Sequence, residues 1–385
     1  MKKILVIHNR YQNIGGEDIA VDNEIALLKE KFEVKELFFD NYLGSIWNFL
    51  KLFFTSINNK SVKELDIIYT NFSPDIVYIH NTWFNASLGI FEYLENKNVQ
   101  ILLKLHNFRY DCTKSFTAKK HLQNKTVCEA CGFKKKRFQY FNKYFNESYL
   151  KSIFVFLYGR KYVKIIFESS FHLAVLTNFH RDRLIKLGVE ENRVSVIPNY
   201  IYPKNNSVSK SSSIDLVYAG RISEEKGVEE LIKEFIRLDI KGINLQIIGT
   251  GPLLDHLLKK YNKDNVYFHG QLSNNETNKI ICNASGIVTA TKLFEGQPTL
   301  LFEAALQKVP AIFPKTGGLN EFFPKNYQLS FNQFQYDDLG KKIKFLFLNL
   351  ENSKKIGIQN FDFIEKNYSK EKIMSQYIKL FNLKI

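Results

Sequence analysis

The sequence predicts an α/β protein of two Rossmann-like domains, each built on a doubly wound parallel sheet. In the first half of the chain, short apolar runs alternate with stretches of helical spacing, and the alternation starts again after residue 213. A polar segment of residues 198–213, with two prolines and five serines, separates the halves. Strands that alternate with helices are typical of parallel sheets, and 385 residues exceed the usual size of one hydrophobic core.

The individual elements follow from apolar runs and helical spacing. In the first half, the predicted strands are Ile4–His8, Asp75–His80, Ile101–His106 and Leu173–Thr177. Helical spacing covers Ile19–Lys31 and Arg181–Leu187, whereas the pattern is unclear between Tyr110 and Phe167. In the second half, the predicted strands are Ile214–Ala219, Leu245–Ile248, Val266–Phe268, Gly286–Ala290 and Val309–Phe313. Helices are expected over Gly227–Leu238 and over residues 351–385.

These elements divide the chain into an N-terminal domain of residues 1–197, a linker of residues 198–213 and a C-terminal domain of residues 214–360. Residues 361–385 form a helical segment that we expect to return to the N-terminal domain. The linker is too polar to bury a core. Two doubly wound sheets joined in this way should face a central cleft, where a ligand binds outside the carboxyl ends of the strands.

Composition limits the class of protein. No stretch reaches the ~18 apolar residues of a membrane-spanning helix, and four cysteines without a secretory signal indicate a reducing cytoplasm. Of the net charge of +15, residues 101–167 contribute +12, because they hold 15 Lys/Arg and 3 Asp/Glu. Such a concentration indicates an anionic partner, namely a membrane surface, a phosphorylated ligand or nucleic acid. A solvated basic face is the alternative.

The strongest chemical signal is the segment Glu295-Gly-Gln-Pro-Thr-Leu-Leu-Phe-Glu303, which follows a predicted strand and enters a helix at Thr299. Backbone amides at the start of this helix can face a phosphate, and the Glu295 carboxylate can accept hydrogen bonds from sugar hydroxyls. The alternative is a helix with one acid favoured by the N-terminal dipole and a second acid in solvent.

Two further loops connect a strand end to a helix start. In the first, Arg221 and Lys226 could stabilise the charge on a leaving nucleotide diphosphate without a metal. In the second, Gly15 and Gly16 allow the backbone to approach an anion closely. The alternatives are two solvated bases flanked by acids, and a plain tight turn.

His106 closes a predicted strand at the sheet edge where ligands bind in such folds. A lone histidine is more often structural than functional, so only its position favours a role in binding.

Together these elements resemble a family 4 glycosyltransferase with the GT-B fold of two Rossmann-like domains. The resemblance extends over nearly the full length. It rests on Gly15-Gly16-Glu17-Asp18, Pro74–Val77 with His80-Asn81, Leu105–Arg109, Arg193–Asn199, Gly220-Arg221 with Lys226-Gly227, Ile248–Pro252, Glu295-Gly296 through Glu303-Ala304, and Thr316-Gly317-Gly318.

The resemblance implies a retaining transferase that takes a hexose-type sugar from a UDP- or GDP-sugar. Arg221 and Lys226 would hold the donor diphosphate. Glu295 would hold the sugar hydroxyls, and Glu303 the ribose. The remaining expected donor-binding residues are Gly15, Gly16, Gly296 and Thr299.

The resemblance also implies the mechanism. His106 would lie near the anomeric carbon. His106 and Glu295 would be the catalytic residues. The acceptor hydroxyl attacks on the face that the nucleotide leaves, and the leaving phosphate takes the acceptor's proton. No protein nucleophile and no cofactor is then required, because catalysis depends on positioning and electrostatics.

Two positions depart from the family pattern. Pro298 stands where many relatives have a glycine whose amide faces the donor, and proline offers no N–H. Tyr200 follows Asn199 in place of the common glycine.

Cys112, Cys128 and Cys131 form a Cys-x15-Cys-x2-Cys pattern in the basic segment. Three thiolates in this pattern suggest a structural zinc ion that needs one more ligand. Relatives with this insertion often have a further cysteine where this chain has Tyr144, so His121 or another histidine would have to substitute. Free thiols in a loop are the alternative.

Two stretches, Leu43–Ile57 and Phe133–Phe167, are unusually rich in aromatic and apolar residues, and the second also interleaves cations. This composition suits an anionic lipid surface, single-stranded nucleic acid or ordinary core packing. We expect a cytoplasmic protein that is peripheral on the inner face of the cell membrane. Its acceptor would be a glycan that is linked to a polyprenyl diphosphate, and its pathway would be surface polysaccharide biosynthesis.

Two rival functions use the same observations. One is a nucleotide-sugar epimerase or a phosphorylase on the same fold. The other is a basic nucleic-acid-binding protein, although no helix-turn-helix or RNP-like motif favours it, and no nucleic-acid partner is expected.

Overall fold

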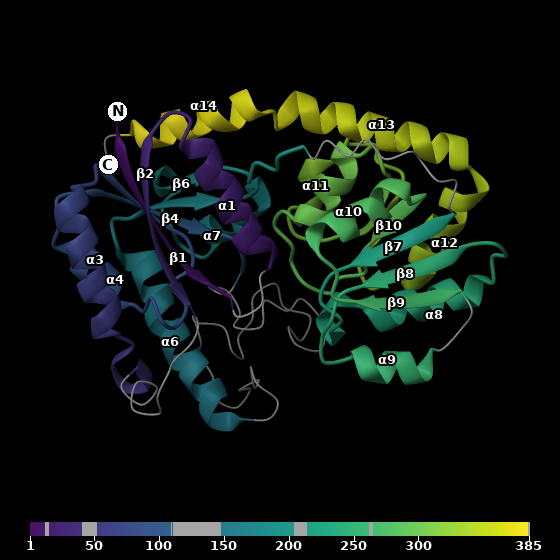
Figure 1. Ribbon diagram of the computed structural model, residues 1–385, viewed down its shortest axis with the longest axis horizontal. Coiled ribbons are helices and arrows are strands. Elements are labelled where there is room, and N and C mark those ends of the chain that lie inside the picture. Colours follow the sequence, from purple (N-terminus) through teal and green to yellow (C-terminus); the bar gives the residue numbers. More distant parts are fainter. Residues whose placement is uncertain are drawn as a thin grey trace. The chain divides into compact units, whose positions relative to one another are not determined.

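The computed structural model describes residues 1–11, 15–40, 52–108, 110, 148–203, 214–261 and 265–383. The chain divides into two compact units, one of Met1–Tyr200 with Lys370–Ile385 and one of Ile201–Ser369. Each unit contains a six-stranded sheet with helices packed on it (Figure 1), and all the described strand pairs are parallel. The prediction of two parallel-sheet α/β domains is therefore confirmed.

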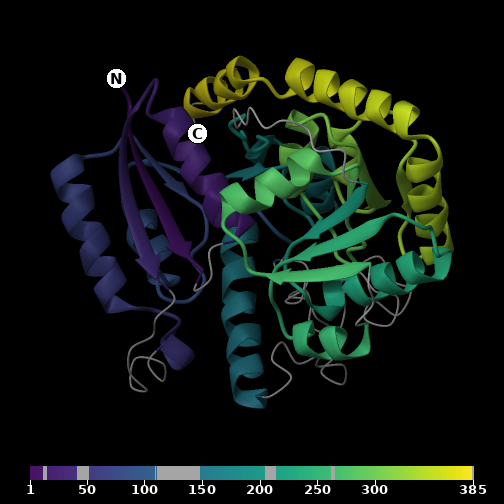
Figure 2. The same ribbon diagram turned by 45° about the vertical axis from the view of Figure 1, so that its right-hand side comes forward.

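The sheet of the first unit has the strand order β2-β1-β3-β4-β5-β6. Its strands are β1 (Lys3–Arg10), β2 (Glu33–Asp40), β3 (Ile76–Ile79), β4 (Gln100–Leu105), β5 (His172–Val175) and β6 (Val194–Val196). Its helices are α1 (Gly16–Leu28), α3 (Asn59–Phe72), α4 (Gly89–Glu95), α6 (Tyr149–Glu168), α7 (Asn178–Lys186) and α14 (Lys370–Phe381). The C-terminal helix α14 packs against α1 (Figure 1 and Figure 2).

The sheet of the second unit has the strand order β12-β11-β10-β7-β8-β9. Its strands are β7 (Asp215–Ala219), β8 (Asn244–Ile248), β9 (Val266–Gly270), β10 (Gly286–Val288), β11 (Ala311–Lys315) and β12 (Ser330–Asn332). Its helices are α8 (Val228–Leu238), α9 (Leu254–Lys260), α10 (Asn274–Asn283), α11 (Thr299–Leu306), α12 (Tyr336–Leu348) and α13 (Leu350–Asn367). One apolar cluster lies between the sheet and α8, α9 and α12, and a second lies between the sheet and α10, α11 and α13.

The start of the expected linker is part of the folded structure. Asn199, Tyr200 and Ile201, which lie within the expected linker of residues 198–213, are buried. Tyr200 and Ile201 supply apolar surface that the serine-rich remainder lacks, and Ile201 belongs to an apolar cluster of the second unit. Residues 204–213 lie outside the described residues.

The aromatic stretches are described only in part. Phe53 stacks on Phe154 of α6, with ring centroids 5.9 Å apart, and the Tyr158 hydroxyl donates to the Thr82 carbonyl, so core packing explains these residues. The N-terminal half of α6 nevertheless exposes Leu150, Ile153 and Leu157. No described helix combines the length and the apolarity needed to cross a bilayer.

Candidate functional site

The second unit brings its predicted residues together at the point where the strand order reverses. Strands β7 and β10 are neighbours, with β8 and β9 on one side and β11 and β12 on the other. In doubly wound sheets, ligands bind outside the carboxyl ends of the strands at this point. Arg221 and Lys226 lie in the loop after β7, and Glu295 lies in the loop after β10.

Lys226 and Glu295 form an ion pair at this point, although 69 residues separate them in the chain. Lys226 Nζ lies 2.7 Å from Glu295 Oε1, and the Thr291 hydroxyl donates to the same oxygen at 2.9 Å. Both charged side chains are partly exposed, at 29% and 19%, so a ligand can reach them. Glu295 Oε2 makes no hydrogen bond with a described residue, which leaves it free to accept one.

Gly227 explains why the two loops can lie so close. Its φ is +67°, and a Cβ at this position would lie 2.1 Å from the Ala290 carbonyl oxygen at the end of β10. Only glycine therefore allows the chain after Lys226 to pass against this strand end and enter α8.

Arg221 differs from Lys226 because its side chain is exposed and has no hydrogen-bond or ion-pair partner among the described residues. Its position is set by its backbone, since the Tyr218 hydroxyl donates to the Arg221 carbonyl at 2.8 Å. The loop thus presents Lys226, which is paired with Glu295, and Arg221, whose side chain has no partner among the described residues.

The Glu295 loop is held by hydrogen bonds from the loop that follows β11. The Gly318 N–H donates to the Glu295 carbonyl at 2.9 Å, and the Thr316 hydroxyl donates to the Leu293 carbonyl at 3.0 Å. A Cβ at Gly317 would lie 2.2 Å from the Glu295 carbonyl oxygen. The glycine pair of the sequence motif therefore positions Glu295.

Substituting Gly317 with alanine is expected to destabilise the protein by about 3–4 kcal/mol, because a left-handed backbone (φ +55°) and a collision with the Glu295 backbone add together. The matched control is Gly242→Ala, where φ is +76° and the added Cβ meets nothing within 4 Å. It should cost only the backbone strain, about 1–2 kcal/mol. Calorimetric unfolding of both variants measures the difference, and equal costs would contradict the tight packing.

The segment after Glu295 has the predicted strand, loop and helix order. Gly296 is buried, α11 begins at Thr299, and Glu303 is half-buried one turn into the helix. Pro298 takes the position before the helix without a side-chain cap, and its carbonyl accepts a hydrogen bond from the Leu301 N–H at 3.2 Å, which leaves the N–H groups of Thr299 and Leu300 for other partners. The alternative in which Glu303 lies fully in solvent does not hold.

In the first unit, the strand order reverses between β1 and β3. Gly15 is the N-terminal cap of α1, and Gly16 is its first residue. The Asp18 carboxylate accepts hydrogen bonds from the Gly15 N–H at 2.9 Å and from His8 Nε2 at 3.0 Å. Burial raises the pKa of Asp18, but these hydrogen bonds outweigh it, and the pKa lies below its ordinary value. The tight turn is therefore stabilised by the residues of its own motif.

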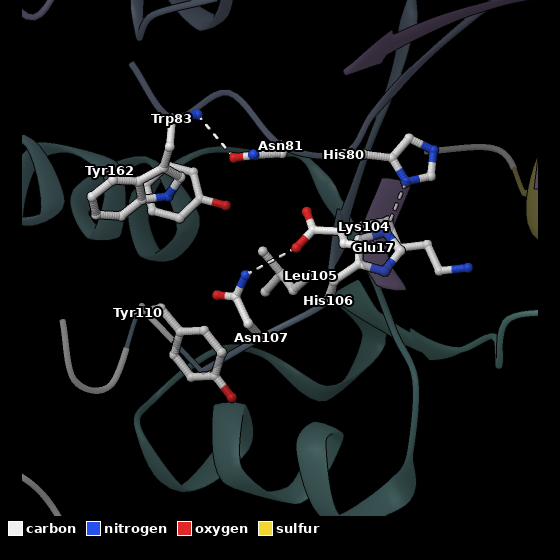
Figure 3. Close-up of a pocket in the computed structure, with 10 residues that line it drawn as sticks. All are labelled: Glu17, His80, Asn81, Trp83, Lys104, Leu105, His106, Asn107, Tyr110 and Tyr162. Atoms are coloured by element: carbon white, nitrogen blue, oxygen red, sulfur yellow. Dashed lines mark hydrogen bonds between the residues drawn. The ribbon is translucent and has the colours of Figure 1, made fainter. Parts of the chain in front are cut away.

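His106 lines a small pocket that opens to solvent. The pocket residues come from α1, α6 and the carboxyl ends of β3 and β4, and Figure 3 shows Glu17, His80, Asn81, Trp83, Lys104, Leu105, His106, Asn107, Tyr110 and Tyr162. Asn107 Nδ2 donates to Glu17 at 3.4 Å, and His106 Nε2 lies 2.9 Å from His80 Nδ1.

Lys104, which lines this pocket, belongs to a buried charged pair. Lys104 Nζ lies 2.8 Å from Glu24 Oε2, and neither side chain is exposed. The hydroxyls of Tyr78 and of Tyr377 on α14 both donate to Glu24 Oε1, and Lys104 also donates to the Tyr377 hydroxyl at 2.9 Å. Burial lowers the pKa of Lys104, against the opposing effect of Glu24.

The predicted residues therefore fall into two groups. Lys226 and Glu295 form an ion pair in the second unit, which also carries Arg221, whereas Gly15, Gly16 and His106 belong to the first unit. Cys112, Cys128, Cys131 and His121 lie outside the described residues, and within the described ranges no cluster of three His, Cys, Asp or Glu side chains could hold a metal ion. Sequence reasoning assigned no role to Thr291, His80 or the Lys104–Glu24 pair. A lysine within the apolar run Ile101–Leu105 was the available signal for that pair.

A family model matches part of the chain. Residues 204–362 match the model of the glycosyl transferases group 1. The matched range lies within the unit that carries Arg221, Lys226 and Glu295.

Curated relatives match the chain over part of its length. A glycosyltransferase of Methanocaldococcus jannaschii, itself uncharacterized, is 23% identical over 61% of this chain and 64% of its own. An uncharacterized 41.2 kDa protein in the cps region of Klebsiella pneumoniae is 20% identical over 51% of this chain and 57% of its own. The chain thus spans less than two thirds of the length of these relatives.

Solved structures match the whole fold. The Anabaena protein HepE, solved in complex with UDP-glucose, superposes with a TM-score of 0.69 at 13% identity and covers all of both chains. With the two six-stranded parallel sheets, this likeness confirms the GT-B fold. The family match supports the prediction of a glycosyltransferase enzyme.

Proposed function

We propose that the chain is a retaining glycosyltransferase that moves a hexose-type sugar from a nucleotide diphosphate sugar to a glycan acceptor in surface polysaccharide biosynthesis. The observation that supports this most is the pairing of Lys226 with Glu295 at the strand-order reversal, beside the exposed Arg221. Further support comes from the group 1 match over the same unit and from a relative in a cps region.

The donor site follows from these charges. Arg221 and Lys226 would contact the diphosphate and neutralise the charge that develops on it as it leaves. Glu295 Oε2 would accept a hydrogen bond from a sugar hydroxyl, and Glu303 would bind the ribose. The N–H groups at the start of α11, near Gly296 and Thr299, would add positive dipole ends. The UDP-glucose bound to HepE supports a UDP-sugar, with a GDP-sugar as the alternative.

The proposed reaction needs no proton transfer to or from a protein side chain. The bond between the anomeric carbon and the diphosphate oxygen breaks, and the acceptor oxygen bonds to the anomeric carbon on the same face. Because the acceptor bonds on the face that the diphosphate leaves, the anomeric configuration is retained, and the acceptor's proton passes to the departing phosphate oxygen. Lys226, Arg221 and Glu295 orient the donor and stabilise the departing charge.

Thermal shift tests the donor site. With UDP-glucose at about 100 times its Kd, the linkage relation gives roughly 2.7 kcal/mol of stabilisation, or several degrees in Tm. Arg221→Ala should lose most of this shift at unchanged ligand-free Tm, because Arg221 has no partner to lose among the described residues. The control is Arg237→Ala, which removes an exposed cation paired with Glu234 in the same unit. No stabilisation by any UDP- or GDP-sugar would contradict the proposal.

The acceptor is proposed to be linked to a polyprenyl diphosphate at the inner face of the cell membrane. The support is the charge of +12 over residues 101–167, together with exposed Phe54, Leu150 and Leu157. The protein should float with anionic liposomes at low salt, and it should not float with zwitterionic liposomes or at high salt, because salt screens the attraction. Failure to float with anionic liposomes at low salt would contradict membrane docking.

A further inference from the structure

His80 forms a buried pair with the pocket residue His106. His80 directly follows β3, and His106 directly follows the neighbouring strand β4. His80 is 1% exposed, its Nδ1 lies 2.9 Å from His106 Nε2 (Figure 3), and the planes of the two rings are 27° apart. One of the two nitrogens must carry the proton of this hydrogen bond, and the surroundings decide which.

Both imidazoles are neutral near pH 7. Burial, together with the charges of Lys104 and His8, lowers the pKa of His80 well below its ordinary value. Burial, together with His80 and Lys104, does the same to the pKa of His106. A neutral imidazole carries a single proton, on Nδ1 or on Nε2.

The surroundings of the other His80 nitrogen, Nε2, decide which nitrogen carries the proton. His80 Nε2 is buried and makes no hydrogen bond with a described residue. A buried N–H without an acceptor is rare and costly, whereas the same proton on Nδ1 forms the hydrogen bond to His106. His80 therefore donates from Nδ1, and His106 accepts at Nε2.

We infer that His80 is a positioning residue that fixes His106 as the Nδ1–H tautomer, so that His106 meets its ligand as a hydrogen-bond donor and not as a general base. His106 is partly exposed and lines the pocket, and its Nδ1 makes no hydrogen bond with a described residue. The ligand class rests on the proposed function: the N–H would bind a sugar oxygen.

The assignment fits the proposed chemistry. A general base at this position would need an unprotonated nitrogen that faces the acceptor hydroxyl. In the Nδ1–H tautomer, the unprotonated nitrogen of His106 faces His80 instead. This agrees with the proposed reaction, in which the departing phosphate takes the acceptor's proton.

Nitrogen NMR of the ligand-free protein tests the tautomer directly. The chain has eight histidines, and the variants His80→Asn and His106→Asn assign the two relevant ring systems. We expect His106 to carry its proton on Nδ1, with Nε2 bare. A proton on His106 Nε2 would overturn the inference. The spectrum needs no nucleotide sugar, so its outcome is separate from the fate of the proposed function.

A matched pair of variants tests the consequence for turnover. His80→Asn retains an amide that can donate near the Nδ1 position, whereas His80→Leu has a similar size and cannot donate. His80→Leu should release the His106 tautomer and lower kcat by about three- to tenfold, the value of one hydrogen bond, with little change in KM. His80→Asn should retain the tautomer and most of kcat. An unchanged His106 tautomer in His80→Leu would overturn the role of His80, and if that variant does not fold, the native spectrum decides.

Discussion

Replacing Lys226 with alanine is expected to lower kcat/KM for a nucleotide diphosphate sugar by roughly a hundred- to a thousandfold, the usual effect of removing one preorganised group that stabilises a developing charge. Lys226 is already held in place by Glu295 at 2.7 Å, so it need not reorganise during the reaction. Most of the loss should appear in kcat, because the charge on the diphosphate grows as the sugar leaves. Steady-state rates of sugar transfer measure it.

The control for this variant is Lys260→Ala. Lys260 Nζ forms an ion pair with Glu229 at 2.8 Å in the same unit, but it lies on α9, outside the loops of the site. Its loss should leave transfer rates within about twofold, since an exposed pair contributes little. Equal losses in both variants would mean that the effect of Lys226 is structural, which would contradict the donor site.

Replacing Glu24 with leucine is expected to destabilise the first unit by about 3–5 kcal/mol, because the Lys104 ammonium would remain buried without its counter-charge. The hydroxyls of Tyr78 and Tyr377 would lose their acceptor as well. The chain allows a selective measurement. Both of its tryptophans, Trp47 and Trp83, precede residue 200, so tryptophan fluorescence during urea unfolding follows this unit alone.

Lys29→Met is the matched control for Glu24→Leu. Lys29 Nζ lies 2.6 Å from Glu36 in the same unit, but its side chain is 52% exposed, and exposed pairs contribute about 0–1 kcal/mol. A loss for Glu24→Leu as small as that for Lys29→Met would mean that water reaches Lys104, which would contradict the burial of the pair.

The fold could be predicted wherever burial leaves an apolar pattern in the sequence. All nine predicted strands are present, each within two residues at either end. The three strands that sequence reasoning missed, β2, β6 and β12, all lie at sheet edges. An edge strand buries less surface: in β2, Glu33 and Asp40 are exposed, and β6 and β12 have three residues each. Helix α6 was missed because apolar Leu150, Ile153 and Leu157 lie on its exposed face and obscure its helical spacing.

The site was predictable to the level of loops. Lys226 and Glu295 were recognised because each follows a strand, and parallel strands end at the same edge. Their ion pair forms because β7 and β10 are neighbours in the sheet, and the order of strands in a sheet cannot be derived from the sequence pattern. His80 was noted only as part of a motif, because its role depends on the neighbouring strand that carries His106.

The assignment of α14 to the first unit affects how the protein can form. Tyr377 lies on that helix and reaches the buried Lys104, so the polar centre of the first unit lacks a member until residues beyond 369 have been synthesised. On the ribosome, all of residues 201–369 are made before this helix. The second unit can therefore finish folding first, and a fragment that stops at residue 200 would lack this contact to the buried charge. A soluble first unit alone requires residues 370–383 to be joined to it.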